Sequence, residues 1–194
     1  MNGHQNLISK LNESHAFWKT VGGEAEDAEL SLIRFSDFVS AHEDCFHRTL
    51  LEGHVTGSAL VVDAACARVL LTHHRKLDKW LQLGGHADGD AKVDQVALRE
   101  AEEESGLKDL RFHPSLKDRP LDWDIHEIPA RPGEPTHFHY DVRYLIQTDY
   151  PKQIQCSHES HALRWFTLDE VTGITTEPSL LRLIDKVRLL QGIM

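Results

Sequence analysis

Three glutamates, Glu100, Glu103 and Glu104, lie three and four positions apart in a stretch with helical periodicity. Residues at these spacings are neighbours on a helix surface, so the three carboxylates would repel one another unless a cation lay between them. Oxygen ligands in this arrangement suit Mg2+ or Mn2+, which complete their coordination with water and phosphate oxygens. The alternative is an acidic helix face that is simply exposed to water.

The helix that would position these carboxylates has clear boundaries in the sequence. The stretch from Gly84 to Asp90, with glycines at 84, 85 and 89, predicts a glycine turn before it, and Gly106 is placed where a left-handed residue would end it. A stripe of small apolar residues at helical spacing suits burial against the rest of the protein, namely Val93, Ala97 and Ala101. We therefore expect a short amphipathic helix with one buried face and one acidic face.

The order of these residues resembles the signature of the Nudix hydrolases. That signature is a glycine, five residues, a glutamate, seven residues and then Arg-Glu-U-x-Glu-Glu-x-Gly-U, where U is apolar. Gly85 and the run from Arg99 to Leu107 match it, whereas Ala91 stands where the family has its first glutamate, next to Asp90. The resemblance covers about residues 54–192.

The resemblance implies hydrolysis of a diphosphate bond by metal-assisted attack of water. The substrate would be a nucleoside diphosphate derivative or a modified nucleoside triphosphate. Glu100, Glu103 and Glu104 would hold Mg2+ or Mn2+, and Arg99 would hold these glutamates in place through charge-assisted hydrogen bonds. The general base would be Glu103, Glu104 or Glu159, which lies in a later loop.

Substrate contacts are predicted just upstream of this helix. Arg75, Lys76 and Trp80 could bind a pyrophosphate or stack on a base, and Gly85 would let the backbone approach the metal site closely. The alternative for the first three residues is a solvated hairpin edge.

The chain also contains 14 histidines, and the spacing of three of them suits a metal site. His86 follows the two glycines, and His137 and His139 lie two apart, on one face of a predicted strand. These imidazoles predict a second metal site for Zn2+ or another transition metal. The alternative is that each is an ordinary polar residue or a substrate contact.

Two other functions compete with hydrolysis. Isopentenyl-diphosphate isomerases resemble Nudix proteins and carry a Cys-Gly-His sequence where this chain has Gly84-Gly85-His86, so the reactive cysteine is missing. A Nudix-like module that binds a nucleotide without cleaving it would fit the loss of the first glutamate to Ala91. The complete run of later glutamates favours hydrolysis over both.

Composition limits the partners and the compartment. The 194 residues carry a net charge of −10 and include no basic stripe, which argues against nucleic-acid binding. Three cysteines without metal-type spacing are typical of reduced thiols, and no membrane-spanning or leader segment is recognisable, so we expect a cytoplasmic protein. The expected partner is a small-molecule nucleotide or diphosphate substrate, and the family resemblance implies a homodimer.

The predicted fold is α/β, a Nudix-type α/β/α sandwich around a mixed β-sheet. Residues 1–48 would form an N-terminal helical extension, with apolar residues of one helix at 7–18 and of a second at 30–39, and 49–194 the Nudix domain. Strands are expected at 54–63, 68–74, 78–83, 110–113, 136–146 and 163–167, a Pro-rich loop near 129–135 and a final helix at 178–190.

Overall fold

The computed structural model describes residues 2–24, 26–75, 77–157 and 160–193. In chain order the elements are α1 (Gly3–Val21), α2 (Ala28–Ala41), β1 (Gly53–Asp63), β2 (Arg68–His74), β3 (Lys79–Leu81), β4 (Leu83–His86), α3 (Val93–Ser105), β5 (Arg111–Phe112), β6 (Asp122–Ile128), β7 (His137–Thr148), a 3-10 turn (Pro151–Gln153), β8 (Ser160–Thr167), α4 (Leu168–Ile174) and α5 (Pro178–Ile193). The predicted α/β class, mixed sheet and N-terminal helices are confirmed.

Strand β1 lies at the centre of one curled, eight-stranded sheet formed by the described residues. It runs parallel to β7, with Gly53 opposite Phe138 and Asp63 opposite Thr148, and antiparallel to both β2 and β4. The β6 strand pairs with β7, and β8 pairs with β2. The sheet is therefore mixed, as predicted.

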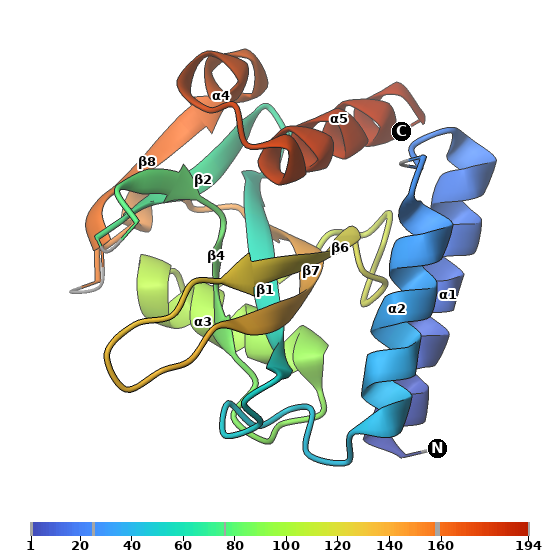
Figure 1. Cartoon of the computed structure of the whole chain (residues 1–194). Helices are drawn as coiled ribbons and strands as arrows, with labels where there is room; N and C mark the ends of the chain where they lie inside the picture. Colours follow the sequence, from blue (N-terminus) through green and yellow to red (C-terminus); the bar gives the residue numbers. More distant parts are fainter. Residues whose placement is uncertain (1, 25, 76, 158–159, 194) are drawn as a thin grey trace.

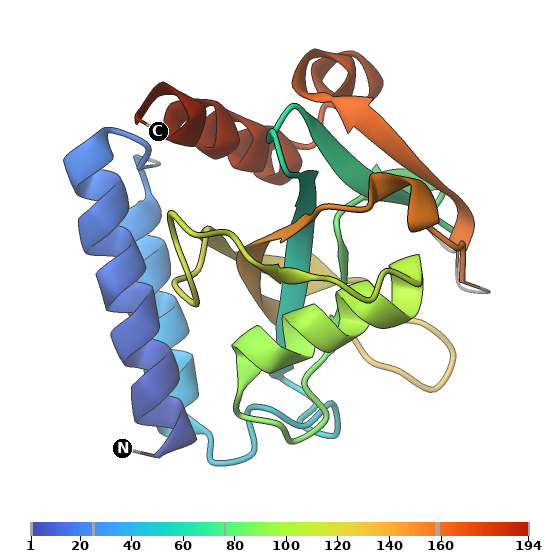
Figure 2. The ribbon, with the colours of Figure 1, turned by 180° about the vertical axis from the view of Figure 1, so that it is seen from behind.

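The two faces of β1 carry different neighbours. Val55, Ala59 and Val61 belong to the core that includes α3 and the N-terminal helices, whereas Leu60 and Val62 belong to the core that includes α5. Because side chains alternate along a strand, His54, Thr56 and Ser58 point to the same side as Leu60. Figure 2 shows α3 crossing one side of the sheet, and Figure 1 shows β6 and β7 curling over the other.

The glycine turn predicted over residues 84–90 is confined to the second half of that stretch. Gly84 and Gly85 lie in β4, paired with Ser58 and Gly57 of β1, and the turn before α3 lies at Asp88-Gly89, where φ is positive. A Cβ on Gly84 would lie 2.6 Å from the Cα of Ser58, so glycine permits the close approach of the two strands.

Helix α3 matches its prediction closely. It ends at Gly106, which has φ 72° and donates its N–H to the carbonyl of Glu102, and Val93, Ala97 and Ala101 are all buried. The final helix α5 likewise buries its predicted stripe of Leu180, Leu183, Ile184, Val187 and Leu190.

The N-terminal helices pack against the sheet rather than standing apart from it. They lie side by side along one end of the molecule (Figure 1), and Leu11, Leu32 and Phe35 share a buried core with β1 and α3. The predicted apolar residues of the second helix do not all face that core, because Leu30 and Ile33 are exposed. No helix of the described chain is both long and apolar enough to cross a membrane.

The contrast within α2 gives a matched stability test. Leu32 is 6% exposed and Leu30 is 69% exposed. We expect Leu32→Ala to lower the free energy of unfolding by roughly 2–5 kcal/mol, because it leaves a cavity in the shared core. The control Leu30→Ala should change it by less than about 0.5 kcal/mol. Urea denaturation measures both, and equal effects would contradict this packing of the extension.

Candidate functional site: an acidic helix beside a histidine cluster

The carboxylate of Glu100 lies directly against the backbone of β4. A Cβ added to Gly85 would lie 2.3 Å from Glu100 Oε2, so this glycine opens the space that the carboxylate occupies. Arg99 Nη2 donates to Glu100 Oε1 at 3.0 Å and to the carbonyl of His86 at 3.4 Å. The Arg99 guanidinium thus connects the acidic helix to the glycine strand.

The other two glutamates differ in exposure. The Glu103 side chain is 65% exposed, with Oε1 4.0 Å from Arg99 Nε, whereas Glu104 is only 9% exposed. Among the His, Cys, Asp and Glu side chains of the described residues, one group of three has ligand atoms close enough to share an ion. That group consists of histidines rather than these glutamates. The donor chemistry still fits a Mg2+-type ion, since three carboxylates on one helix flank a strand whose glycine leaves room for them.

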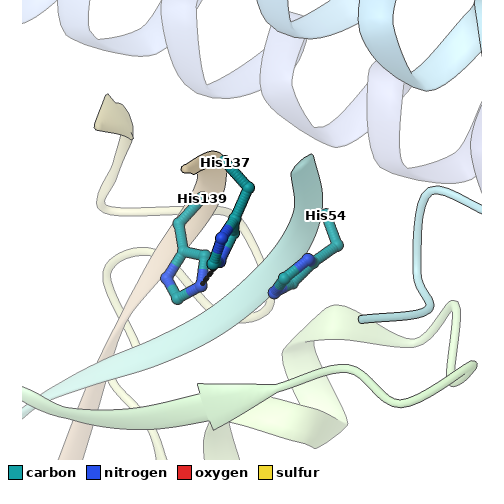
Figure 3. A group of neighbouring side chains, drawn as sticks. All are labelled: His54, His137 and His139. Carbon is teal, nitrogen blue, oxygen red and sulfur yellow. Dashed lines mark hydrogen bonds between the residues drawn. The ribbon is translucent and has the colours of Figure 1, made fainter. Parts of the chain in front are cut away.

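The histidine group is formed by His54, His137 and His139. One ligand atom from each lies within 4.8 Å of the others, and the three rings point toward one another from β1 and β7 (Figure 3). The parallel pairing of these strands places His54 opposite His139. His86, which the sequence prediction grouped with His137 and His139, flanks this group, with its ring centroid 5.0 Å from that of His54 and 5.3 Å from that of His139.

Burial favours the neutral forms of His54, His86 and His139. It lowers the pKa of His54 to about 4, assisted by the neighbouring His86 and His137. Burial also lowers the pKa of His139 to about 2, again assisted by the neighbouring histidines, and it lowers the pKa of His86. At neutral pH the rings of His54, His86 and His139 are therefore uncharged.

A buried ionic network continues from the histidines along the same face of the sheet. Asp141 accepts hydrogen bonds from Thr56 and Ser58 at 2.9 and 2.8 Å, and from Arg143 Nε at 2.9 Å. Asp122 pairs with Lys186 at 2.7 Å and with Arg182 at 2.8 Å, both from α5.

Neighbouring positive charges lower the pKa values of the aspartates in this network. Burial alone would raise the pKa of Asp122, but the charges of Lys186, Arg182 and Arg143 outweigh burial and lower it. Burial acts in the same way on Asp124, and hydrogen bonding from His126 together with the charge of Arg143 brings its pKa well below the usual range. These carboxylates therefore stay ionised and fix β6 to β7 and α5.

Of the predicted substrate residues, Trp80 and Arg75 contact residues outside this network. Trp80 stacks on His73, with ring centroids 5.0 Å apart, and meets Phe166 edge-on. Arg75 is exposed and donates to the carbonyl of Ser160 at 3.4 Å. Lys76 and Glu159 lie outside the described residues.

Sequence reasoning missed several members of this face. His54, Asp122 and Asp124 were not singled out, and the strand that carries the last two was not predicted. The run Asp-Trp-Asp-Ile-His at 122–126 alternates polar and apolar residues, which is the signal that could have found β6. His54 follows a glycine at the start of β1, and only the register with β7 reveals its importance.

Comparison with known proteins agrees with this geometry. A family model described as the NUDIX domain matches residues 54–186. A comparison with curated proteins gave no match. Since the matched region covers more than half of the chain, the protein belongs to the Nudix family.

Several solved structures share the fold at low sequence identity. The C. elegans Ap4A hydrolase binary complex is 19% identical, with a TM-score of 0.58 over 72% of this chain and 98% of that one. The E. coli dihydroneopterin triphosphate pyrophosphohydrolase is 19% identical, with a TM-score of 0.53 over 68% and 92%. The NUDIX domain of Shewanella oneidensis NrtR, complexed with ADP ribose, is 16% identical, with a TM-score of 0.53 over 79% and 96%.

The ionic network predicts a specific loss of stability in acid. An aspartate whose pKa is depressed by folding contributes stability above its unfolded pKa of about 3.9, and loses that contribution as the pH falls through the folded value. We expect Asp124→Asn to cost roughly 3–5 kcal/mol at pH 7, because Arg143 and Arg182 lose a partner in a buried site. The difference from wild type should shrink as the pH falls below about 4.

Urea denaturation between pH 7 and pH 3 measures this difference. Asp185→Asn is the matched control, since Asp185 is exposed and pairs with Arg188 at the surface; it should cost less than about 1 kcal/mol at every pH. A cost for Asp124→Asn that does not vary with pH would contradict the electrostatic origin.

Proposed function

We propose that this protein hydrolyses the diphosphate bond of a nucleoside diphosphate derivative or a modified nucleoside triphosphate. The observation that carries the proposal is the position of the Glu100 carboxylate against Gly85, within a chain that belongs to the Nudix family. A Mg2+ or Mn2+ ion held by Glu100, Glu103 and Glu104 would acidify a water and neutralise charge on the phosphate oxygens when bound. The net charge of −10 supports this, since an anionic substrate needs a cation to approach.

In this proposal Arg99 and Gly85 position the Glu100 carboxylate. The Arg99 guanidinium restrains the Glu100 carboxylate by a charge-assisted hydrogen bond and ties it to the His86 carbonyl, so the helix and strand keep a fixed separation. Gly85 provides the space into which that carboxylate fits. Neither residue needs to contact phosphorus.

The general base is proposed to be Glu103, Glu104 or Glu159, and kinetics can distinguish among them. Glu103 is the exposed carboxylate of the helix and can exchange a proton with bulk water, whereas Glu104 is buried. A residue that acts only as a base should lower kcat when changed to glutamine and leave the required metal concentration unchanged. A metal ligand should raise that concentration.

An isomerase acting on isopentenyl diphosphate is the second candidate, and the histidine group is the observation that favours it. The cysteine that this reaction uses at the corresponding strand is replaced by Gly84, and Cys45 and Cys66 are buried elsewhere. Two assays separate the activities. One measures release of inorganic phosphate or of a nucleotide from a panel of substrates, and the other measures isomerisation of isopentenyl diphosphate.

A cytoplasmic location is a further part of the proposal. All three thiols are free, which supports it.

The central mutational test compares two neighbouring glutamates. Glu103→Gln should lower kcat by more than about 100-fold, because even partners outside the coordination shell contribute up to that much. The control is Glu102→Gln, on the same helix but outside the matched glutamates, which should retain most activity. Circular dichroism and thermal unfolding should show both variants folded as wild type. Full turnover by Glu103→Gln would refute its assigned role.

The glycine contact gives an independent test. Gly85→Ala places a methyl group where the Glu100 carboxylate lies, and that flexible side chain can move at small cost. We expect turnover to fall at least about tenfold, as for loss of a group that orients metal ligands, with little change in melting temperature. Gly173→Ala is the control, because its Cβ would meet nothing within 4 Å. If Gly85→Ala hydrolysed substrate at the wild-type rate, the close approach would have no catalytic role.

A further inference from the structure

We propose that His54, His137 and His139 form a second metal site, specific for Zn2+ or a similar late first-row transition ion. It is separate from the carboxylates of α3. In β4, Gly85 faces Glu100 of the helix, whereas the next residue, His86, points to the histidine side. The two sites therefore lie on opposite sides of one short strand.

The spacing of two ring nitrogens fits coordination. His137 Nε2 and His139 Nε2 are 3.4 Å apart. Two nitrogens bound at Zn–N distances near 2.05 Å in a tetrahedron are separated by about 3.4 Å. The third nitrogen, from His54, lies within 4.8 Å of both, so a small rotation of one ring brings all three onto one ion.

The hydrogen bond on the far side of His137 fixes which nitrogen is available. Nδ1 of this ring lies 2.9 Å from the carbonyl oxygen of Pro135, and a carbonyl can only accept, so Nδ1 carries the proton. Nε2 then presents a lone pair toward His139 and His54. Ligating histidines in proteins are commonly oriented by such an N–H to carbonyl bond.

His54 supplies the observation that points most directly to a ligand. It is 2% exposed, and neither ring nitrogen has a hydrogen-bond partner within the described structure. A buried polar group without a partner costs free energy that a bound ion would recover. The ring instead faces His86, His137 and His139, each about 5 Å away between centroids.

The donor set determines the class of ion. Three imidazole nitrogens suit Zn2+, Co2+ and their neighbours in the first transition series, whereas Mg2+ and Ca2+ prefer oxygen. Glu134 Oε1 lies 3.7 Å from His137 Nε2, which provides a nearby negative charge. Three protein ligands leave a fourth position for His86 or for an oxygen ligand.

Co2+ is the probe, because tetrahedral nitrogen coordination gives it intense visible absorption. The full-length protein, treated with chelator and then titrated with Co2+, should bind one equivalent with such bands, and Zn2+ but not excess Mg2+ should displace it. His54→Asn, His137→Asn and His139→Asn should each weaken binding at least about tenfold. His161→Gln is the control, since His161 is an exposed residue on β8.

Two further measurements test the histidine site without relying on the folding of the histidine variants or on hydrolytic activity. Imidazole nitrogen NMR of the unaltered protein should show Zn2+ shifting the ring resonances of His54, His137 and His139, with no variant needed. Glu103→Gln should retain the Co2+ bands even where phosphate release is lost. The proposal is overturned if wild type binds no stoichiometric Co2+, if the three variants bind as wild type does, or if Zn2+ leaves those resonances unmoved.

Discussion

The long parallel pairing of β1 with β7 is the constraint on which the candidate sites depend. Eleven consecutive residues of β1 are buried and in register with β7. This register sets His54 beside His139 and places Asp141 within hydrogen-bonding distance of Thr56 and Ser58. A shift by one residue would move every polar side chain of β1 into the apolar core under α3. The burial of Val55, Ala59 and Val61 therefore also fixes the polar face.

Side chains of one chemical type cluster on each side of β4, carboxylates on one side and imidazoles on the other. The two clusters differ in how their charges are balanced. Carboxylates on α3 are partly balanced by Arg99, whose side chain is 41% exposed and lies 3.0 Å from Glu100 and 4.0 Å from Glu103. The histidine group instead brings one ligand atom of each ring within 4.8 Å of the others. Further along the face, the buried Asp122 and Asp141 and the partly buried Asp124 pair with Arg143, Arg182 and Lys186, so the charges of this network balance one another. We propose metal binding at the two clusters beside β4, the carboxylates of α3 and the histidine group.

Local patterns predicted the elements whose signals are complete within a few residues. The small-residue stripe and terminal glycine located α3, and strict alternation placed His137 and His139 on one strand face. Pairing between distant strands is harder to predict from the sequence. Gly84 and Gly85 are typical of a turn when considered locally, but they pair with β1 as part of β4, where larger side chains would clash. His54 has no distinguishing neighbours in sequence, because its partners lie about 80 residues away across the β1–β7 pair. Exposure of Leu30 likewise depends on where α2 meets the sheet, which periodicity alone does not fix.

The most direct test of the account is where a divalent cation binds in the folded protein. A crystal structure with Mn2+ and a non-hydrolysable nucleoside diphosphate analogue, with the ion located by its anomalous scattering, answers this. The account predicts an anomalous peak beside β4, coordinated by carboxylates of Glu100, Glu103 and Glu104 and by phosphate oxygens. Glutamate side chains that remain on Arg99 or in bulk solvent, with no peak between them, would contradict it.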